Sequence, residues 1–325
     1  MRELLRRLPW AFLILLATAL PVEAQKFPSR SLRIVSPFPP GGGTDILART
    51  MAQRLTEIWG QQVIVDNRPG ATGIIGTEIV VKAPPDGYTM LLGNSATQAV
   101  NVSMFRKLPY HPLKDLACVS TIARLPVILV VHPSLPVARV KDLVSLGKAR
   151  PGQLTFGSAG NGSPPHLAGE LFSLMAKVKI VHVPYKGGPF ALTELMGGQI
   201  TMYFSNALTA LRLRGTGKLK ALGVSSLKRM AVAPDIPTIS ESGLPGYEEH
   251  IWFAVAVPGA TPAAIVKELN VGIVAALRSK DVAAILTKDG AEIMATGPEE
   301  CTTFTESEIR KYADVIRKSG ISAAD

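Results

Sequence analysis

From Leu32 onwards, the chain alternates short runs of β-branched residues with longer amphipathic segments, and this alternation constrains its fold most strongly. The first unit comprises an expected strand at 32–36, an expected helix at 45–59 and a second strand at 62–65. Strand–helix–strand units form parallel sheets that are covered by helices. We therefore predict an α/β fold, in which ligands bind beyond the carboxyl ends of the strands.

The same alternation continues along the chain and indicates two lobes. Further helices are expected at 74–83, 140–149, 164–175, 187–196, 207–214, 262–279, 282–288 and 299–317, and further strands at 88–92, 117–123, 127–131, 154–156, 180–183, 200–204, 219–224, 251–257 and 292–294. Pro126 separates two of these strands and should interrupt their pairing, so we place a first crossover there and the return near Ser225. A mature chain of about 300 residues exceeds the usual single core. We predict a discontinuous domain 1 at 25–124 and 227–325, and domain 2 at 125–226.

The first 24 residues have the pattern of a secretory signal peptide. Arg2, Arg6 and Arg7 precede an apolar run at 10–20, and Ala24 offers a small residue for cleavage. The run is too short to span a bilayer comfortably, and no cysteine lies at the cleavage site to carry a lipid. We predict that residues 1–24 are removed and that the mature chain is exported.

Composition argues against several classes of partner. The formal net charge is +10, but the basic residues are scattered and aromatic residues make up only 6%, so we expect no nucleic-acid partner. The histidines are dispersed and no closely spaced His/Cys set occurs, so we expect no metal and no cofactor. Cys118 and Cys301 are the only cysteines, and they permit either one disulfide or two free thiols.

A glycine loop follows the first expected strand. Gly41, Gly42 and Gly43 allow the backbone to approach a ligand closely, and Thr44 or Asp45 can cap the helix that follows. The N-terminus of a helix presents unpaired N–H groups and a partial positive charge, so it favours an anionic oxygen. The stretch lacks the lysine of a phosphate-binding loop and the G-x-G-x-x-G spacing, so it does not predict a nucleotide site.

A second loop of the same kind occurs at 157–162. It leads into an expected helix for which Ser163 is a good N-cap and Pro164 suits the first helical position. Two helix N-termini could therefore face one cleft between the lobes and hold a carboxylate from both sides.

An ordered set of motifs resembles the Bug proteins, the TctC-like periplasmic receptors of tripartite tricarboxylate transporters. The set is P-F-P-P-G-G-G-T-D (37–45), V-D-N-R-P-G-A-T-G (65–73), P-D-G-Y-T (85–89), S-A-G-N-G-S-P-P-H-L-A (158–168), H-V-P-Y-K-G (182–187), P-D-I-P-T (234–238) and L-P-G-Y (244–247). The resemblance covers essentially the whole mature chain. It implies a two-lobed type II periplasmic binding protein, or Venus flytrap, in which each lobe is a mostly parallel sheet flanked by helices.

The resemblance also implies a function and a site. The protein would be a monomeric periplasmic receptor, not an enzyme, that binds a small organic acid by hinge closure and delivers it to the membrane subunits of a tripartite transporter. Ligand contacts carried over position by position are Phe38, Gly42, Thr44, Asp45, Ala71 and Ser95 in the first lobe, and Ser158, Ala159, Gly162, Ser163, His166 and Lys186 in the second.

One further site position departs from the family pattern. Ser205 stands where many relatives have an aspartate, in a motif that they read as M-F-D-N. Loss of that carboxylate would remove a partner for an amino group, so the hypothesis is a ligand without a free α-amine.

Alternatives remain at the level of both residue and function. His166 can fix the geometry of its loop instead of touching ligand, and Lys186 can be an ordinary solvated lysine. A hydrolase that uses Ser158 with His166 is possible by spacing, although Ser158 lacks the G-x-S-x-G elbow. A receptor that signals to a sensor kinase would have the same binding site, and only its partner would differ.

Overall fold

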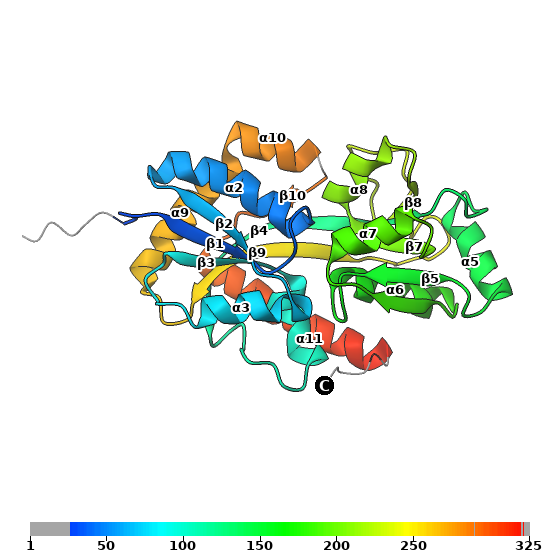
Figure 1. Cartoon of the computed structure of the whole chain (residues 1–325), viewed down its shortest axis with the longest axis horizontal. Coiled ribbons are helices and arrows are strands. Elements are labelled where there is room, and N and C mark those ends of the chain that lie inside the picture. Colours follow the sequence, from blue (N-terminus) through cyan, green and yellow to red (C-terminus); the bar gives the residue numbers. More distant parts are fainter. Residues whose placement is uncertain (1–26, 289, 320, 322–325) are drawn as a thin grey trace, which may run out of the picture.

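One long strand, β4 (Leu116–Val131), runs through both lobes of the molecule (Figure 1). The computed structural model describes residues 27–288, 290–319 and 321, so the predicted signal peptide at 1–24 lies outside the described residues. Buried side chains of β4, such as Ile122 and Leu129, belong to one apolar core that continues from the first lobe into the second. The lobes therefore share a sheet and a core along their common strand.

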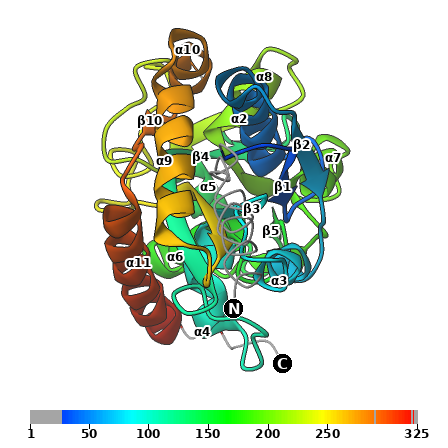
Figure 2. The same cartoon turned by 90° about the vertical axis from the view of Figure 1, so that its left-hand side faces the viewer.

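The first lobe is built on strands β1 (Leu32–Ser36), β2 (Val63–Asn67) and β3 (Thr89–Asn94), with β1 parallel to both neighbours. Strand β9 (His250–Pro258) runs antiparallel between β3 and β4, and β10 (Glu292–Ile293) also pairs with β4. Helices α2 (Gly43–Trp59) and α10 (Lys280–Lys288) lie on one side of the strands, and α3 (Ile74–Val81) and α11 (Pro298–Ser319) lie on the other (Figure 1). Helix α9 (Ala263–Arg278) packs between α2 and α11 (Figure 2).

The second lobe repeats this plan. Strand β5 (Thr155–Ser158) is parallel to β6 (Val181–Pro184) and β7 (Met202–Asn206), while β7 and β8 (Lys220–Val224) run antiparallel to the end of β4. Its helices are α5 (Val140–Ala149), α6 (Pro164–Ala176), α7 (Gly188–Met196) and α8 (Ala207–Arg214). The sheet is therefore parallel where the loops of the cleft arise, and every antiparallel pair of strands named here involves β4 or β9.

The prediction that Pro126 separates two strands is wrong. Strand β4 continues through Pro126, but its partners change there: residues up to Pro126 pair with β9, and residues from Val127 pair with β7 and β8. A proline lacks an N–H donor, so it costs little at the point where one set of partners ends and another begins. Val127 N then donates to Ser225 Oγ at 2.9 Å.

Two short helical segments after β3 are absent from the sequence prediction. After β3, the chain forms a π-helix at Ala96–Val100 and the short helix α4 (Asn101–Met104). All five residues of the π-helix are buried, so this stretch shows no amphipathic alternation by which it could be recognised. By contrast, the predicted bounds of α5 and α8 match those in the structure.

The chain between β8 and β9 packs on the second lobe before it returns. Ile239 N donates to the Val224 carbonyl at 2.8 Å, and the Tyr247 hydroxyl donates to the Ala168 carbonyl on α6 at the same distance. Glu249 N then donates to the Ser225 carbonyl, and β9 starts at His250, opposite Pro126. Three chain segments thus meet at Val127, Ser225 and Glu249.

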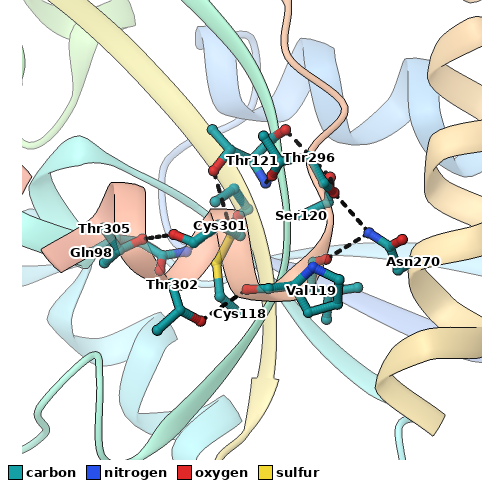
Figure 3. Close-up of a disulfide and its surroundings, with 12 residues drawn as sticks. Gln98, Cys118, Val119, Ser120, Thr121, Asn270, Thr296, Cys301, Thr302 and Thr305 are labelled. Carbon is teal, nitrogen blue, oxygen red and sulfur yellow. Dashed lines mark hydrogen bonds between the residues drawn. A yellow bond between two sulfur atoms is a disulfide. The ribbon is translucent and has the colours of Figure 1, made fainter. Parts of the chain in front are cut away.

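Cys118 and Cys301 form a disulfide in the first lobe, which resolves the alternative that the sequence left open. The bond joins the beginning of β4 to the first turns of α11 (Figure 3). Thr121 Oγ1 donates to Cys301 Sγ at 3.4 Å, and Ser120 Oγ donates to the Thr296 carbonyl at 2.9 Å. Within the described ranges, no helix combines the length and apolar character of a membrane span.

Candidate functional site

The two lobes enclose a small cavity of about 50 Å3 where their glycine loops meet. This inner cavity is lined from the first lobe by Phe38, Pro39, Gly42, Gly43, Thr44, Asn94, Ile251 and Phe253, and from the second by Ala159, Pro164, Pro165, Gly188, Pro189, Tyr203 and Asn206. None of these lining residues carries a charge. Any charge brought by a ligand would therefore face dipoles and hydrogen-bond donors instead of a counter-ion.

The first glycine loop brings the N-terminus of α2 to this cavity. Gly42 is the N-cap, and no side chain caps the N–H groups of the first turn. Those groups have no partner within the helix, and the helix dipole adds a partial positive charge to them. The start of α2 is therefore suited to an anionic oxygen, and the binding of one there stays a prediction.

Asp45 supports this loop from behind and does not line the cavity. Its carboxylate accepts hydrogen bonds from Gly41 N at 2.9 Å, Arg49 Nε at 3.0 Å and Asn67 Nδ2 at 2.9 Å. Burial favours a higher pKa for Asp45, but the bonds from Arg49, Gly41 and Asn67 outweigh it and lower the pKa below the usual 3.8. The carboxylate is thus ionised, and it stabilises the glycine loop through these hydrogen bonds.

The second lobe contributes helix N-termini other than the one expected. Pro164 and Pro165 occupy the start of α6, and a proline has no N–H to donate. Gly188 instead opens α7, where no side chain caps the first turn, although Pro189 at the second position lacks an N–H. Asn206 caps α8 through a bond from Thr209 N to its Oδ1 at 2.9 Å. Gly188 and Asn206 both line the inner cavity.

Tyr203 adds a hydroxyl to the same wall. Its side chain is only 3% exposed, and burial raises its pKa well above the usual 10, so the group is a neutral donor. The hydroxyl lies against Gly188, where an added Cβ would be 2.9 Å from it. Tyr203 is not predicted as a site residue, because its place within a strand gives no local signal. Gly188 and Asn206 are also absent from the predicted site, although the pair Gly187-Gly188 and a polar residue before a helix are recognisable in the sequence.

Ser158 and His166 stabilise the second glycine loop from beneath. Ser158 Oγ lies 2.6 Å from His182 Nε2 and accepts from Gly160 N at 3.1 Å, while Gly162 N donates to His166 Nδ1 at 3.0 Å. The rings of His166 and His182 stack with their centroids 3.9 Å apart. Burial, together with the neighbouring His166, lowers the pKa of His182 to about 3. The pairing of Ser158 with His166 that a hydrolase would need is therefore not present, and His182 is a poor general base.

Of the predicted site residues, some line a cavity and the others line none. Phe38, Gly42, Thr44 and Ala159 line the inner cavity, and Phe38, Ala71, Ala159 and Lys186 line a second, outer cavity of about 610 Å3. Those that line neither cavity are Asp45, Ser95, Ser158, Gly162, Ser163, His166 and Ser205. Ser205 is fully buried and donates to the Asn206 carbonyl at 3.2 Å. Whether each residue contacts ligand stays a prediction.

The rims of the lobes touch directly. Thr72 Oγ1 donates to the Asn161 carbonyl at 2.8 Å across the cleft. An added Cβ at Gly43 would lie 2.9 Å from Asn206 Nδ2, and one at Gly187 would lie 2.5 Å from Pro39. Glycine is therefore required at both positions for this close approach of the lobes.

The described part of the chain contains no group of three or more His, Cys, Asp or Glu side chains placed to hold a metal ion. The walls of the inner cavity offer hydrogen-bond donors, helix dipoles and apolar surface, and those of the outer cavity add the ammonium group of Lys186. Such a site can bind and orient an acid.

Comparison with known proteins agrees with this geometry. The model of the family "Tripartite tricarboxylate transporter family receptor" matches residues 47–321. Protein BugT of Bordetella pertussis is 38% identical over 310 residues, which are 95% of each chain. The structure of R. palustris Rpa4515 with adipate has a TM-score of 0.89 at 39% identity, and the match covers 91% of this chain and 99% of that one.

A second ligand-bound structure is also similar. MatC from Rhodopseudomonas palustris with bound malate has a TM-score of 0.85 at 32% identity, over 89% of this chain and all of that chain. Because the family match and these relatives extend over nearly the whole chain, the protein belongs to the tripartite tricarboxylate transporter receptor family, the Bug proteins, and is a periplasmic-type solute-binding protein and not an enzyme.

Proposed function

We propose that the protein captures a small organic acid between its lobes. The observation that carries this proposal is an uncharged inner cavity at which the N-termini of α2, α7 and α8 converge. A helix dipole contributes about 0.3–1 kcal/mol to anion binding when exposed and about 2 kcal/mol when partly buried. Charge-assisted hydrogen bonds add roughly 1.5–3 kcal/mol each, so a few of them reach the 8 kcal/mol or so of micromolar affinity.

The ligand would lack an ammonium group. No acidic side chain lines the inner or the outer cavity, and the nearby Asp45 carboxylate is already engaged by three donors. An amino acid would therefore bury its ammonium without a counter-ion, which is costly. Related structures with bound adipate and malate support an acid without an amine.

Capture would proceed by closure of the lobes about a hinge. The proposed hinge lies where the chain segments meet at Val127, Ser225 and Glu249. The proposed domains are domain 1 at 25–124 and 227–325, and domain 2 at 125–226. The packing of Tyr247 on α6 favours a return crossing closer to Glu249. Ligand held by both lobes would stabilise the closed state through its additional contacts.

The family supports a role in uptake. The mature chain would act in the periplasm as a monomer, and the closed receptor would deliver its acid to the membrane subunits of a tripartite transporter. Deletion of the gene should abolish uptake of the labelled acid by whole cells, and re-expression of the full chain should restore it. Uptake that persists without the gene would contradict this role.

Thermal unfolding of the mature chain with a panel of mono-, di- and tricarboxylates, amino acids and aromatic acids tests the proposal. A ligand at 100 times its dissociation constant stabilises the folded state by about 2.7 kcal/mol. We expect acids without an amine to raise the melting temperature, and the Tyr203→Phe variant to reduce that rise. A rise with amino acids alone would contradict the proposed site.

A further inference from the structure

A groove lies apart from the two cavities of the cleft, between α8 of the second lobe and α10 of the first (Figure 1). It has a volume of about 740 Å3 and is lined by Leu211, Arg212, Arg214, Val232, Ile285 and Lys288. Among the described residues, none lines both this groove and a cavity of the cleft. Each lobe contributes one helix to the groove, so its width depends on how the lobes lie relative to each other.

The groove is basic. Arg212, Arg214 and Lys288 are exposed in its walls, and none of the described residues that line it is acidic. Asp235 forms an ion pair with Arg214, which joins the end of α8 to the segment after β8, but the two other basic side chains leave an excess of positive charge. Such a surface attracts acidic groups, and arginine is enriched in interfaces between proteins.

Apolar side chains are exposed beside these charges. Ile285 on α10 is 42% exposed and Val232 is 43% exposed, and both line the groove. An added Cβ at Gly290 would lie 3.5 Å from Val232 Cγ2, so the segment that carries Val232 packs against the loop after α10. Exposed apolar side chains that are gathered in a groove and rimmed by charges are typical of an interaction site.

Helix α8 connects this groove to the inner cavity. Its N-cap Asn206 lines the inner cavity, whereas Arg212 and Arg214 in its last turn line the groove. Under the proposed closure, a ligand held by both lobes would fix the position of α8 relative to α10. A partner that fits the groove in this arrangement would prefer the liganded receptor, and by linkage it would tighten the binding of the acid by the same factor.

We propose that the groove between α8 and α10 is the surface that docks on a membrane subunit of the transporter, and that it takes a protein segment with acidic and apolar side chains. The carboxylates would pair with Arg212 and Lys288, and the apolar side chains would cover Val232 and Ile285. This proposal rests on the proposed function and deepens it, because it assigns the partner to one surface and gives a physical reason for preferring the acid-loaded receptor.

Binding of the labelled mature chain to proteoliposomes that contain the transporter's membrane subunits tests this surface, with and without a saturating acid. We expect the acid to tighten this binding. Lys288→Glu reverses a charge and should weaken it about tenfold, and Ile285→Ser should weaken it about fivefold. Lys288→Arg keeps the charge and should bind like the wild type. Calorimetry should give the same dissociation constant for the acid in all of these variants.

Lys148→Glu, at an exposed position of α5, is the matched charge reversal and should bind the proteoliposomes like the wild type. Equally strong binding to protein-free liposomes of phosphatidylethanolamine and phosphatidylglycerol would overturn the proposal in favour of a lipid surface. Self-association of the wild type that Lys288→Glu abolishes would overturn it in favour of a second copy of the chain.

The failure of this surface is distinguishable from the failure of the proposed function. If the wild type binds an acid but not the proteoliposomes, or if Lys288→Glu and Ile285→Ser bind the proteoliposomes like the wild type, the docking surface is wrong and the proposed function stands. If none of the acids binds to the wild type, the proposed function fails and the docking proposal fails with it.

Discussion

The side chain of Asp45 fixes the shape of the first glycine loop. Its carboxylate joins Gly41, Arg49 and Asn67, so the glycine loop, helix α2 and strand β2 are held in one arrangement. Because the N–H groups at the start of α2 depend on that arrangement, a residue that does not line the cavity would still control the geometry of anion binding.

Asp45→Asn should weaken acid binding about tenfold and destabilise the fold by about 1–3 kcal/mol, because the charge-assisted bond to Arg49 is lost. The pKa of Asp45 is lowered, so its stabilising effect is fully present above pH 3.8 and is lost as the pH falls through the lower pKa of the folded state. Urea unfolding between pH 2.5 and 7 should therefore show the variant converging on the wild type in acid. Glu57→Gln on exposed α2 surface is the control, and a constant difference at all pH values would contradict this account.

For single residues, the sequence predicts which loops form the site better than it predicts which side chains face the cavities. Gly42 and Thr44 line the inner cavity, as the glycine pattern indicates, since backbone approach depends on glycine itself. Ser158 and His166 are predicted to contact ligand, but their side chains instead accept hydrogen bonds from backbone N–H groups of the second loop. The direction in which a side chain points depends on packing partners such as His182, which lie in other elements and leave no local signal.

The disulfide Cys118–Cys301 acts at the scale of elements, because it ties the start of β4 to the start of α11 (Figure 3). A crosslink across 183 residues restricts the unfolded chain strongly, and such bonds contribute about 2–5 kcal/mol. Neither cysteine lines the inner or the outer cavity. The bond should therefore support the fold without taking part in recognition.

A reducing agent should lower the melting temperature of the wild-type chain while leaving the dissociation constant for its acid unchanged. The double variant Cys118→Ser/Cys301→Ser should show the lower melting temperature from the start and no further response to reduction. A large loss of affinity on reduction would contradict a purely structural role, and calorimetry beside thermal unfolding distinguishes the two results.

Most elements could be predicted from their apolar periodicity or from the glycine, proline and capping residues at their ends. The failures depend on features that the local sequence does not show. The π-helix at Ala96–Val100 has no exposed face, and the sequence around Pro126 predicts a break because it does not reveal the change of strand partners. Tertiary contacts decide both cases, so local pattern is insufficient there.

Glu249 lies where the two lobes join, so its ionisation should affect the stability of the whole molecule. Its side chain is nearly buried and accepts a hydrogen bond from the Tyr312 hydroxyl at 3.1 Å, and its carbonyl accepts one from Ser225 Oγ. Burial raises its pKa to about 7, Glu308 and Glu248 add to the rise, and Lys311 and Tyr312 oppose it. Between pH 4.5 and about 7 the folded protein holds a proton that the unfolded chain has released.

Stability of the wild type should therefore fall as the pH rises from 4.5 to about 7, relative to that of Glu249→Gln. The glutamine cannot ionise and can still accept from Tyr312, so its curve should lack this component. Chemical unfolding across this range measures the difference. Glu268→Gln, on the exposed surface of α9, should follow the wild type, and parallel curves for wild type and Glu249→Gln would refute the assignment.

Thr72 links the rims of the two lobes, so its effect should appear only when the lobes are together. Its hydroxyl donates to Asn161 across the cleft, and its backbone has a left-handed φ of 52°, which is strained for a β-branched residue. Thr72→Val keeps that shape and strain but loses a bond of about 1 kcal/mol, so bound acid should dissociate about fivefold faster. Stopped-flow dissociation measures this rate, and Thr50→Val on α2 is the control. Under the proposed closure mechanism the bond forms only when the lobes close on ligand, so the unliganded variant should unfold like the wild type. Equal destabilisation with and without ligand would show that the lobes stay joined in the absence of ligand.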